Sequence, residues 1–218
     1  MATYHARLIC TLIALFTFCS VHGAWAGPPT DQLREGVDRV IKILQDPELK
    51  GDKYLDQRRA AIALAARAIF DFGEMARRSL AQHWEKRTPA EQGEFVRIFT
   101  ALIERTYISK VDQNDVARWM TYRGETADAD YAVVQTTVTL NNGRELALDY
   151  RMHKPRDHWR VYDLTIDGTS MVSNYRAQFN KVIRTSSYEA LVARIRSNLA
   201  QVEYSAPAAA SAGTGAAR

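Results

Sequence analysis

Few residues of this chain have the types and spacing that catalysis requires. Asp149 and Asp163 lie on adjacent predicted strands and could form a carboxylate pair for acid–base chemistry. Asp149 is instead expected to face water, and Asp163 to hold a turn or a neighbouring arginine. Residues 168–172 (GTSMV) resemble half of a nucleophile elbow but lack its second glycine and follow no predicted parallel strand. A helix N-cap at Thr169 or Ser170 explains the same residues better.

The remaining polar residues give no support for a metal or cofactor site. Outside the N-terminal segment the histidines are His83, His153 and His158, and none has a partner histidine, cysteine or carboxylate at metal-ligand spacing. No glycine-rich phosphate loop is present. Basic residues alternate with acidic ones, and the formal net charge is only +4, which argues against a nucleic-acid-binding stripe. We therefore expect no metal, no cofactor other than a bound cargo, and no nucleic-acid partner.

Residues 1–26 have the pattern of a secretory signal. His5 and Arg7 precede an apolar run of about ten residues, and Ala24-Trp25-Ala26 offers an A-x-A cleavage site. The run is too short to span a bilayer. Cleavage would remove both cysteines, so the exported chain could hold no disulfide. The rest of the chain is long enough for one domain, which we place at residues 27–202. Residues 203–218, rich in Ala, Ser and Gly, are expected to be disordered.

The least ambiguous element is a helix that begins after Thr88. Thr88-Pro89-Ala90-Glu91 forms a capping box with proline at the first helical position. The apolar residues at helical spacing then lie on more than one side of the helix and are dominated by large aromatics. Such a stripe can belong to a solid core, which is the ordinary outcome, or it can line an apolar cavity.

Three helical patterns precede this helix and two follow the strands. The first is expected to be capped by Thr30 or Asp31 and to end before Pro47, the second to run over about 54–70, and the third over about 71–84. The fifth pattern follows Asp167-Gly168. The sixth is expected to begin at a capping box formed by Ser186 and Glu189.

After Asp112 the apolar period changes from 3.6 to 2 residues. Four strands are predicted, at residues 118–126, 131–140, 145–154 and 159–166, joined by turns short enough to make neighbouring strands antiparallel. Apolar side chains alternate with polar ones on the second and third strands, so one face of the sheet should be solvated and the other covered by helices. The predicted class is α+β.

Several stretches, in their order and spacing, resemble the MlaC family, the phospholipid-binding component of a toluene-tolerance ABC transport system. They cover about residues 33–199 and include 70–77 (FDFGEMAR), 88–92 (TPAEQ), 105–107 (RTY), 149–151 (DYR), 159–163 (WRVYD), 168–172 (GTSMV) and 175–179 (YRAQF). Two departures are visible. Ala81 stands where the family often has glycine, and Thr169 where it often has valine.

The resemblance implies an MlaC-like, cone-shaped and NTF2-like arrangement in which an antiparallel sheet of about four strands and several helices enclose a deep apolar lipid cavity. It implies a periplasmic, non-enzymatic monomer that shuttles phospholipid between an inner-membrane Mla-type ABC transporter and an outer-membrane lipoprotein–porin complex, preserving outer-membrane lipid asymmetry. The candidate wall residues are Phe72, Met75, Leu80, Trp84, Phe95, Phe99, Leu102, Tyr107, Val134, Val138, Leu148, Tyr150, Val161, Val172, Tyr175 and Phe179.

Two other classes remain open on sequence. An exported pocket enzyme on an NTF2-like fold would use Asp149 or Asp163 as a base on a small apolar substrate. An adaptor that only bridges two proteins would have a solid core. The amount of phospholipid that copurifies with the protein separates the carrier from both.

Overall fold

The computed structural model describes residues 28–114, 120–140 and 142–205. The predicted signal segment 1–26 and the chain after Ser205 lie outside the described residues. The elements are, in order, α1 (Pro29–Gln45), the 3₁₀ turns η1 (Pro47–Leu49) and η2 (Asp52–Tyr54), α2 (Leu55–Ile69), α3 (Phe72–Leu80), η3 (Ala81–His83), α4 (Pro89–Asn114), β1 (Met120–Asp128), β2 (Tyr131–Thr139), β3 (Glu145–His153), β4 (Arg160–Ile166), β5 (Thr169–Ser170), α5 (Met171–Thr185) and α6 (Tyr188–Ser205).

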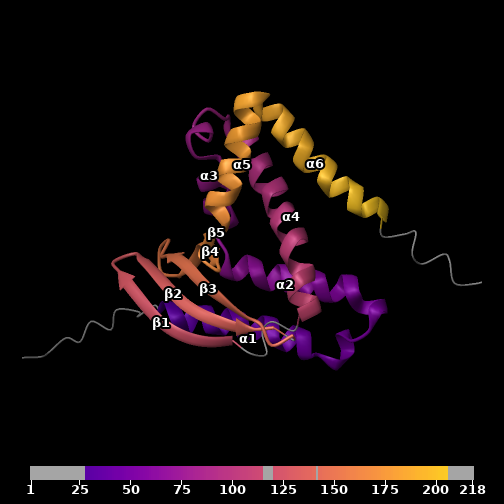
Figure 1. The fold of residues 1–218 in the computed structure, drawn as a ribbon, viewed down its shortest axis with the longest axis vertical. Coiled ribbons are helices and arrows are strands. Elements are labelled where there is room, and N and C mark those ends of the chain that lie inside the picture. Colours follow the sequence, from indigo (N-terminus) through magenta and orange to yellow (C-terminus); the bar gives the residue numbers. More distant parts are fainter. Residues whose placement is uncertain (1–27, 115–119, 141, 206–218) are drawn as a thin grey trace, which may run out of the picture.

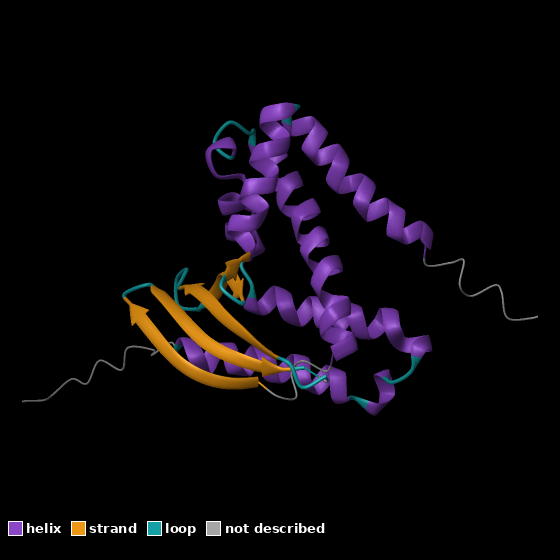
Figure 2. Ribbon diagram, viewed as in Figure 1, coloured by secondary structure: helices purple, strands orange, loops and turns teal. Residues whose placement is uncertain are grey.

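The strands form an antiparallel sheet in the order β1-β2-β3-β4-β5. The predicted α+β class with an antiparallel sheet is confirmed, and β5 is a short fifth strand that the sequence did not reveal. Figure 1 and Figure 2 show α1 alongside the sheet, with α3, α4, α5 and α6 grouped at the other end of the molecule. Helix α4 extends from that group towards α2, so it belongs to both halves.

Alternation along the central strands decides which side chains are covered. On β2 the buried residues are every second one, and on β3 Leu148, Tyr150 and Met152 repeat the pattern. Helix α1 packs against β1 and β2, and its Leu33 is fully buried. One-sided burial is thus confirmed for β2 and β3. On β4, Asp163 and Thr165 are also buried, so this strand is covered on both faces.

Two apolar clusters share the interior. One contains the inner sheet face with Leu33 and Val37 of α1, and the other contains α3, α4, α5 and α6. Partly buried Phe70, Leu164 and Ile166 contact both clusters. The interior is therefore continuous from the sheet to the helical end.

Helix starts follow the sequence in part. Thr88 and Glu91 form the predicted capping box, with the Thr88 amide donating to Glu91 at 2.7 Å. Ser170 caps α5 by accepting from the Ser173 amide at 3.0 Å, which confirms the N-cap interpretation.

Two predicted caps are wrong. Thr30 does not cap α1, because the helix begins at Pro29 and the Thr30 amide and hydroxyl both donate to Glu125 of β1. Ser187, rather than Ser186, caps α6 by accepting from the Ala190 amide.

Three predicted boundaries also differ. The third helix ends at Leu80 and continues only as a 3₁₀ turn. Strand β1 is described from Met120 to Asp128, two residues past the predicted end, while residues 115–119 lie outside the described part. Helix α6 runs to Ser205, past the expected boundary at residue 203.

Candidate functional site

An apolar cavity of about 420 Å³ lies between the sheet and the helices. Its volume falls within the range of roughly 300–1,000 Å³ usual for small-molecule pockets. Every long helix except α6 contributes to the wall, as do β1, β2, β3 and β4. The lining residues are Leu33, Val37, Val40, Ile62, Ala66, Ile69, Phe70, Phe72, Met75, Ile103, Glu104, Tyr107, Ile108, Lys110, Val111, Met120, Val138, Leu140, Leu146, Leu148, Tyr150, Leu164, Ile166 and Met171.

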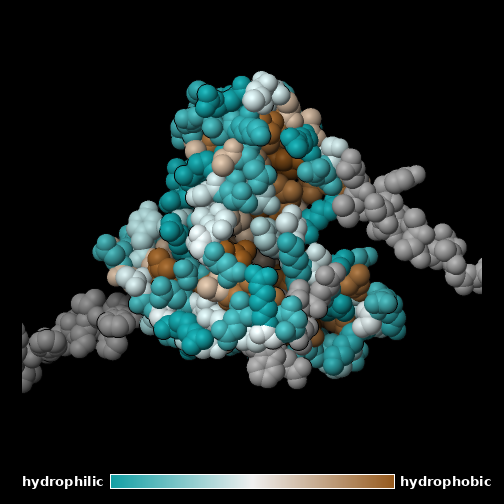
Figure 3. Space-filling view, viewed as in Figure 1, coloured by the Kyte–Doolittle hydropathy of each residue, from teal (hydrophilic) through white to brown (hydrophobic). Residues whose placement is uncertain are grey.

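The surface also shows where apolar residues gather. On the face seen in Figure 3, apolar residues gather in the hollow where the helical end meets the sheet, and again along the inner sides of the upper helices. Most of the remaining surface of this view is polar, with smaller apolar patches near its left edge and at its lower right. An apolar ligand in the hollow would therefore exchange water for hydrocarbon on most sides.

Strand pairing and helix geometry place the wall residues. Val138 pairs with Leu146, and Leu148 pairs with Ile166, so three strands present aliphatic side chains on one face. On α4, residues 103, 104, 107, 108, 110 and 111 recur at helical spacing and turn the C-terminal half of the helix towards the cavity. The alternating residues of the strands and the helically spaced residues of α4 thus line the same cavity.

Six of the predicted wall residues line this cavity. They are Phe72, Met75, Tyr107, Val138, Leu148 and Tyr150. The other predicted residues lie elsewhere. Val134 of β2 and Val161 of β4 are fully buried in the cluster on the inner sheet face. The rest belong to the helical cluster: Leu80, Trp84, Phe95, Phe99, Leu102, Val172, Tyr175 and Phe179. Lipid contact remains a prediction for all sixteen.

The helical cluster is centred on packed aromatic rings. Phe95 and Phe99 have ring centroids 6.0 Å apart, and Phe179 meets both edge-on, at 5.7 and 6.1 Å. Tyr175 meets Phe99 edge-on at 5.7 Å, and Tyr188 lies 6.3 Å from Phe95. Rings at these separations fill their space with mutual contacts, as in an ordinary core. The aromatic stripe of α4 therefore forms a core at its N-terminal half and a cavity wall at its C-terminal half.

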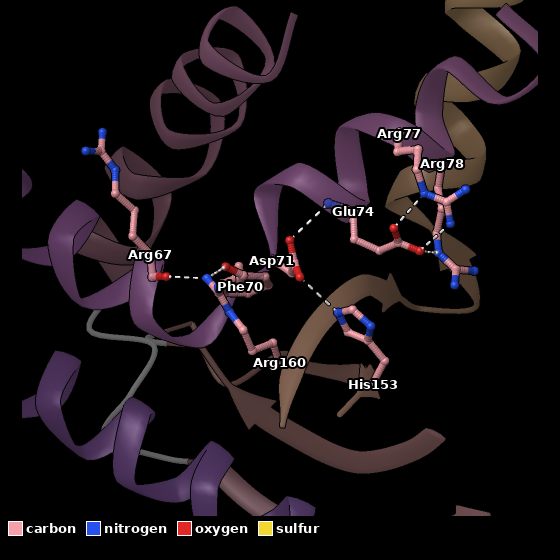
Figure 4. A network of polar contacts seen from close by, with 8 residues as sticks. All are labelled: Arg67, Phe70, Asp71, Glu74, Arg77, Arg78, His153 and Arg160. Carbon is pink, nitrogen blue, oxygen red and sulfur yellow. Dashed lines mark hydrogen bonds and ion pairs between the residues drawn. The ribbon is translucent and has the colours of Figure 1, made fainter. Parts of the chain in front are cut away.

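A polar network fixes the turn between α2 and α3 (Figure 4). Asp71 accepts from the Glu74 amide at 3.0 Å and so caps α3, and its other oxygen lies 3.0 Å from His153 Nε2. Arg160 of β4 donates to the carbonyls of Arg67 and Phe70 at 2.8 and 2.6 Å. These contacts join the end of α2 and the start of α3 to the sheet.

The same turn carries cavity residues on both sides of Asp71. Phe70 and Phe72 both line the cavity, and Phe70 forms a parallel bridge with Val161 of β4. The Asp71 amide also donates to the Val161 carbonyl at 2.8 Å. The polar network thus positions two aromatic side chains of the wall.

The charged members of the lining lie on α4. Glu104 accepts two hydrogen bonds from Arg67 of α2, at 2.6 and 2.9 Å, and Lys110 is exposed with its ammonium 5.3 Å from the ring centroid of Tyr107. Farther along, Asp112 lies 2.5 Å from Arg58 and 3.5 Å from Arg59. Ion pairs between α2 and α4 therefore border the apolar space.

Two tyrosines bring hydroxyl groups to the wall. Burial, with Tyr175 beside it, raises the pKa of Tyr107 to about 12. Burial, together with the neighbouring Tyr122, raises the pKa of Tyr150 well above its ordinary value. Both hydroxyls therefore stay protonated and neutral near pH 7, as an apolar site requires.

The residues considered for catalysis have structural partners or lie apart from the cavity. Asp163 accepts from the Ser170 hydroxyl at 2.6 Å and from the Val172 amide at 3.0 Å, so it holds the start of α5. This confirms that it holds a turn, through α5 rather than through an arginine. Asp149 lies on the opposite strand face from Leu148 and Tyr150. In the described residues, no group of three or more His, Cys, Asp or Glu is placed to hold a metal.

Two of the three histidines have local hydrogen-bond partners, and the third is exposed. His83 lies 2.9 Å from Asn180, and His153 contacts Asp71 as described above. His158 is exposed in the turn before β4. None of these rings lines the cavity.

Sequence reasoning missed much of the aliphatic wall. Leu33, Val37 and Val40 of α1, and Ile62, Ala66 and Ile69 of α2, line the cavity but are not among the sixteen predicted wall residues. Their helical spacing was the available signal. Many of the predicted wall residues are aromatic, and several of these pack against each other in the helical cluster instead.

The fold and the cavity define an α+β protein built around an apolar pocket. No helix among the described residues has both the length and the apolar character needed to cross a membrane. A family model described as MlaC protein matches residues 34–197, and the chain therefore belongs to the MlaC family.

A solved structure supports the same assignment. A phospholipid-binding protein from Ralstonia solanacearum, determined in complex with a phospholipid, is 29% identical to this chain. The match covers 81% of this chain and 99% of that one, with a TM-score of 0.70.

Proposed function

We propose that this protein carries phospholipid by holding acyl chains in the cavity between the sheet and α1–α5. The observation that carries the proposal is the lining of that cavity, which is apolar apart from Glu104, Lys110 and two tyrosine hydroxyls. Each CH₂ group moved from water into such a space contributes about 0.8 kcal/mol. Acyl chains can therefore be held firmly with few polar contacts.

The family and the solved relative support this proposal. The Ralstonia solanacearum protein of the same fold was determined with a phospholipid bound. The acyl chains of a lipid crossing an aqueous compartment must be shielded, and a preformed cavity provides that shield. Turnover of a small substrate has less support, since Asp163 is engaged by Ser170 and Val172 and no histidine reaches the cavity.

The predicted signal segment and the family support a proposal for the cellular role. We place the protein in the periplasm as a monomer that receives or delivers lipid at an inner-membrane Mla-type ABC transporter and an outer-membrane lipoprotein–porin complex. Its loss should weaken outer-membrane lipid asymmetry. Labelling of phosphatidylethanolamine amines on intact cells should then increase in a strain that lacks the chain, and unchanged labelling would contradict this role.

The binding step is tested on the purified protein. Organic extraction followed by mass spectrometry should recover phospholipid at roughly one or more molecules per protein. A protein purified from the periplasm without any phospholipid would favour the enzyme or the adaptor class. Recovery of a small apolar metabolite instead would specifically favour the enzyme.

A further inference from the structure

A tyrosine whose hydroxyl has no hydrogen-bond partner in the described protein lines the cavity. Tyr150 is 7% exposed and lines the apolar space. Within the part of the chain that the structure describes, its hydroxyl forms no hydrogen bond. Polar groups in the interior of folded proteins nearly always have a hydrogen-bond partner, so a hydroxyl that opens on an apolar cavity is expected to bind a ligand atom or a water.

A second hydroxyl lies close by. Tyr122 of β1 is opposite Thr136, and Tyr150 is opposite Val134 two residues along β2, so both tyrosines are on the covered face. The Tyr122 hydroxyl oxygen is buried and also lacks a hydrogen-bond partner. The Arg34 guanidinium lies over the Tyr122 ring, 4.6 Å from its centroid. Thr136, between the two tyrosines, donates to the Leu148 carbonyl.

The position of Tyr150 along β3 places it on the cavity wall, away from the end of the strand that joins the β2–β3 hairpin. The three wall residues of this strand are Leu146, Leu148 and Tyr150, and Leu146 is the most exposed. Leu146 and Tyr150 are four positions apart along the strand, about 13 Å at the usual rise per residue. The charged wall residues Glu104 and Lys110 lie on α4, on another side of the space. Tyr150 therefore offers a polar atom within an apolar interior.

We propose that the Tyr150 hydroxyl, with Tyr122 beside it, is a hydrogen-bonding subsite for an oxygen atom on the acyl part of the bound lipid. This rests on the proposed lipid-carrier function. A phenol hydroxyl can donate to an ester carbonyl or to a hydroxyl group on the chain, and both are oxygen acceptors in otherwise apolar segments. The subsite would set the depth to which a lipid enters, because hydrocarbon contacts alone are non-directional.

The test compares pairs of lipids that differ only in oxygen atoms on their chains. Affinities of the intact protein are measured by calorimetry for dioctanoyl-phosphatidylglycerol and for its dioctyl ether analogue, which lacks the carbonyls. A second pair is 3-hydroxytetradecanoate and tetradecanoate. A neutral hydrogen bond corresponds to roughly two- to tenfold in affinity. The wild type should prefer the oxygen-bearing member of at least one pair by that factor, and Tyr150→Phe should abolish the preference.

The pair that responds identifies the oxygen. A preference confined to the ester pair indicates the ester carbonyl, and one confined to the hydroxy acid indicates the chain hydroxyl. Equal affinities within both pairs, or a preference retained by Tyr150→Phe, would overturn the subsite and indicate that water satisfies the hydroxyl. Failure of the wild type to bind any of the four lipids would instead overturn the carrier function.

Stability provides a second readout. Tyr150→Phe should not lower the melting temperature of the protein, because the wild-type hydroxyl has no protein hydrogen bond to lose. Tyr188→Phe is the matched control, since that hydroxyl donates to the Glu91 carbonyl at 3.3 Å in the helical cluster and should not affect lipid preference. A drop of several degrees for Tyr150→Phe would show an existing protein partner and overturn the proposal.

Discussion

Asp163 shows how a carboxylate that resembles a catalytic base can serve the fold. Its side chain is 4% exposed and accepts from the Ser170 hydroxyl and the Val172 amide. A carboxylate at the first turn of α5 also faces the positive end of the helix dipole. Its burial is thus explained without any substrate.

Asp163→Ala should therefore act on stability. Loss of both acceptor oxygens leaves a partly buried hydroxyl and a buried helix-terminal amide unpaired, which is expected to lower the free energy of unfolding by about 2–4 kcal/mol. Asp149→Ala, on the more exposed face of β3, should change it by less than about 1 kcal/mol. Urea unfolding monitored by circular dichroism measures both variants. Equal effects would show that Asp163 does not hold α5.

Ala81 gives a second prediction at the residue scale. It ends α3 with φ 47° and ψ −120°, a backbone conformation that glycine adopts easily and residues with a Cβ do not. This accounts for the glycine that the family often has at this position. Ala81→Gly should raise the free energy of unfolding by about 1 kcal/mol. A loss of stability would mean that the Cβ contributes packing that outweighs the strain.

The sequence predicts side-chain direction better than side-chain role. Alternation correctly placed Val138, Leu148 and Tyr150 on the covered face, because a strand turns successive residues to opposite sides. Periodicity alone does not show whether an inward residue lines a cavity or packs in a solid core. Phe95 and Phe99 have the same helical pattern as Ile103 and Tyr107, and only the positions of α5 and α6 determine which half of α4 is filled by rings.

At the element scale, α1 and α2 approach each other at a glycine. A Cβ on Gly36 would lie 2.5 Å from a side-chain carbon of Ile69, a cavity residue, whereas a Cβ on Gly93 of α4 would meet nothing within 4 Å. Gly36 is thus required by packing and Gly93 is not.

The two glycines form a matched pair of substitutions. Gly36→Ala should lower the free energy of unfolding by about 1–3 kcal/mol, because α1 and α2 must separate or Ile69 must move. Gly93→Ala should raise it by up to about 1 kcal/mol, through better helix propensity. Thermal denaturation of both proteins provides the comparison. Stabilisation by Gly36→Ala would contradict the close approach.

Helix α3 gives a prediction of pH dependence. Burial of Glu74 favours its neutral form, but hydrogen bonds from Arg77 and Arg78 at 2.7 Å outweigh burial and lower its pKa below the ordinary value of 4.5. A lowered folded-state pKa adds stability that is present above pH 4.5 and is lost as the pH falls through the folded-state value.

Glu74→Gln should remove this contribution. The wild type should exceed the variant by about 1 kcal/mol in free energy of unfolding at pH 7, and the difference should shrink as the pH falls below 4.5. Urea titrations at a series of pH values measure it. A difference that stays constant or grows towards low pH would contradict the assigned direction.

Elements were predictable where local signals agree. The Thr88 capping box and the Ser170 cap were identified because a polar side chain reaches its own helix start. The cap of α1 was missed because Thr30 is engaged by Glu125, ninety-five positions away. Ser186 and Ser187 are adjacent candidates, and their spacing to Glu189 favoured the wrong one.

At the scale of the whole molecule, the α+β class and the antiparallel pairing of the strands can be predicted from the sequence, but the cavity cannot. Two-residue periodicity with short turns requires an antiparallel meander, and apolar helices must cover one of its faces. Whether the layers meet or leave about 420 Å³ between them depends on the sum of many side-chain volumes. The cavity was expected from the family resemblance rather than from the residue pattern.

The central claim, that this cavity holds phospholipid, is tested most directly by native mass spectrometry of the protein purified from the periplasm. Leu148→Asp places a carboxylate on the cavity wall, and Leu64→Asp makes the same change at a side chain that is 70% exposed on α2. Burial of a charge against hydrocarbon costs several kcal/mol unless water enters.

The wild type and Leu64→Asp should therefore carry a mass equal to one or more phospholipids, and folded Leu148→Asp should have lost most of it. A wild-type protein at its bare chain mass, or full phospholipid occupancy in folded Leu148→Asp, would contradict the assignment of the cavity as the lipid site.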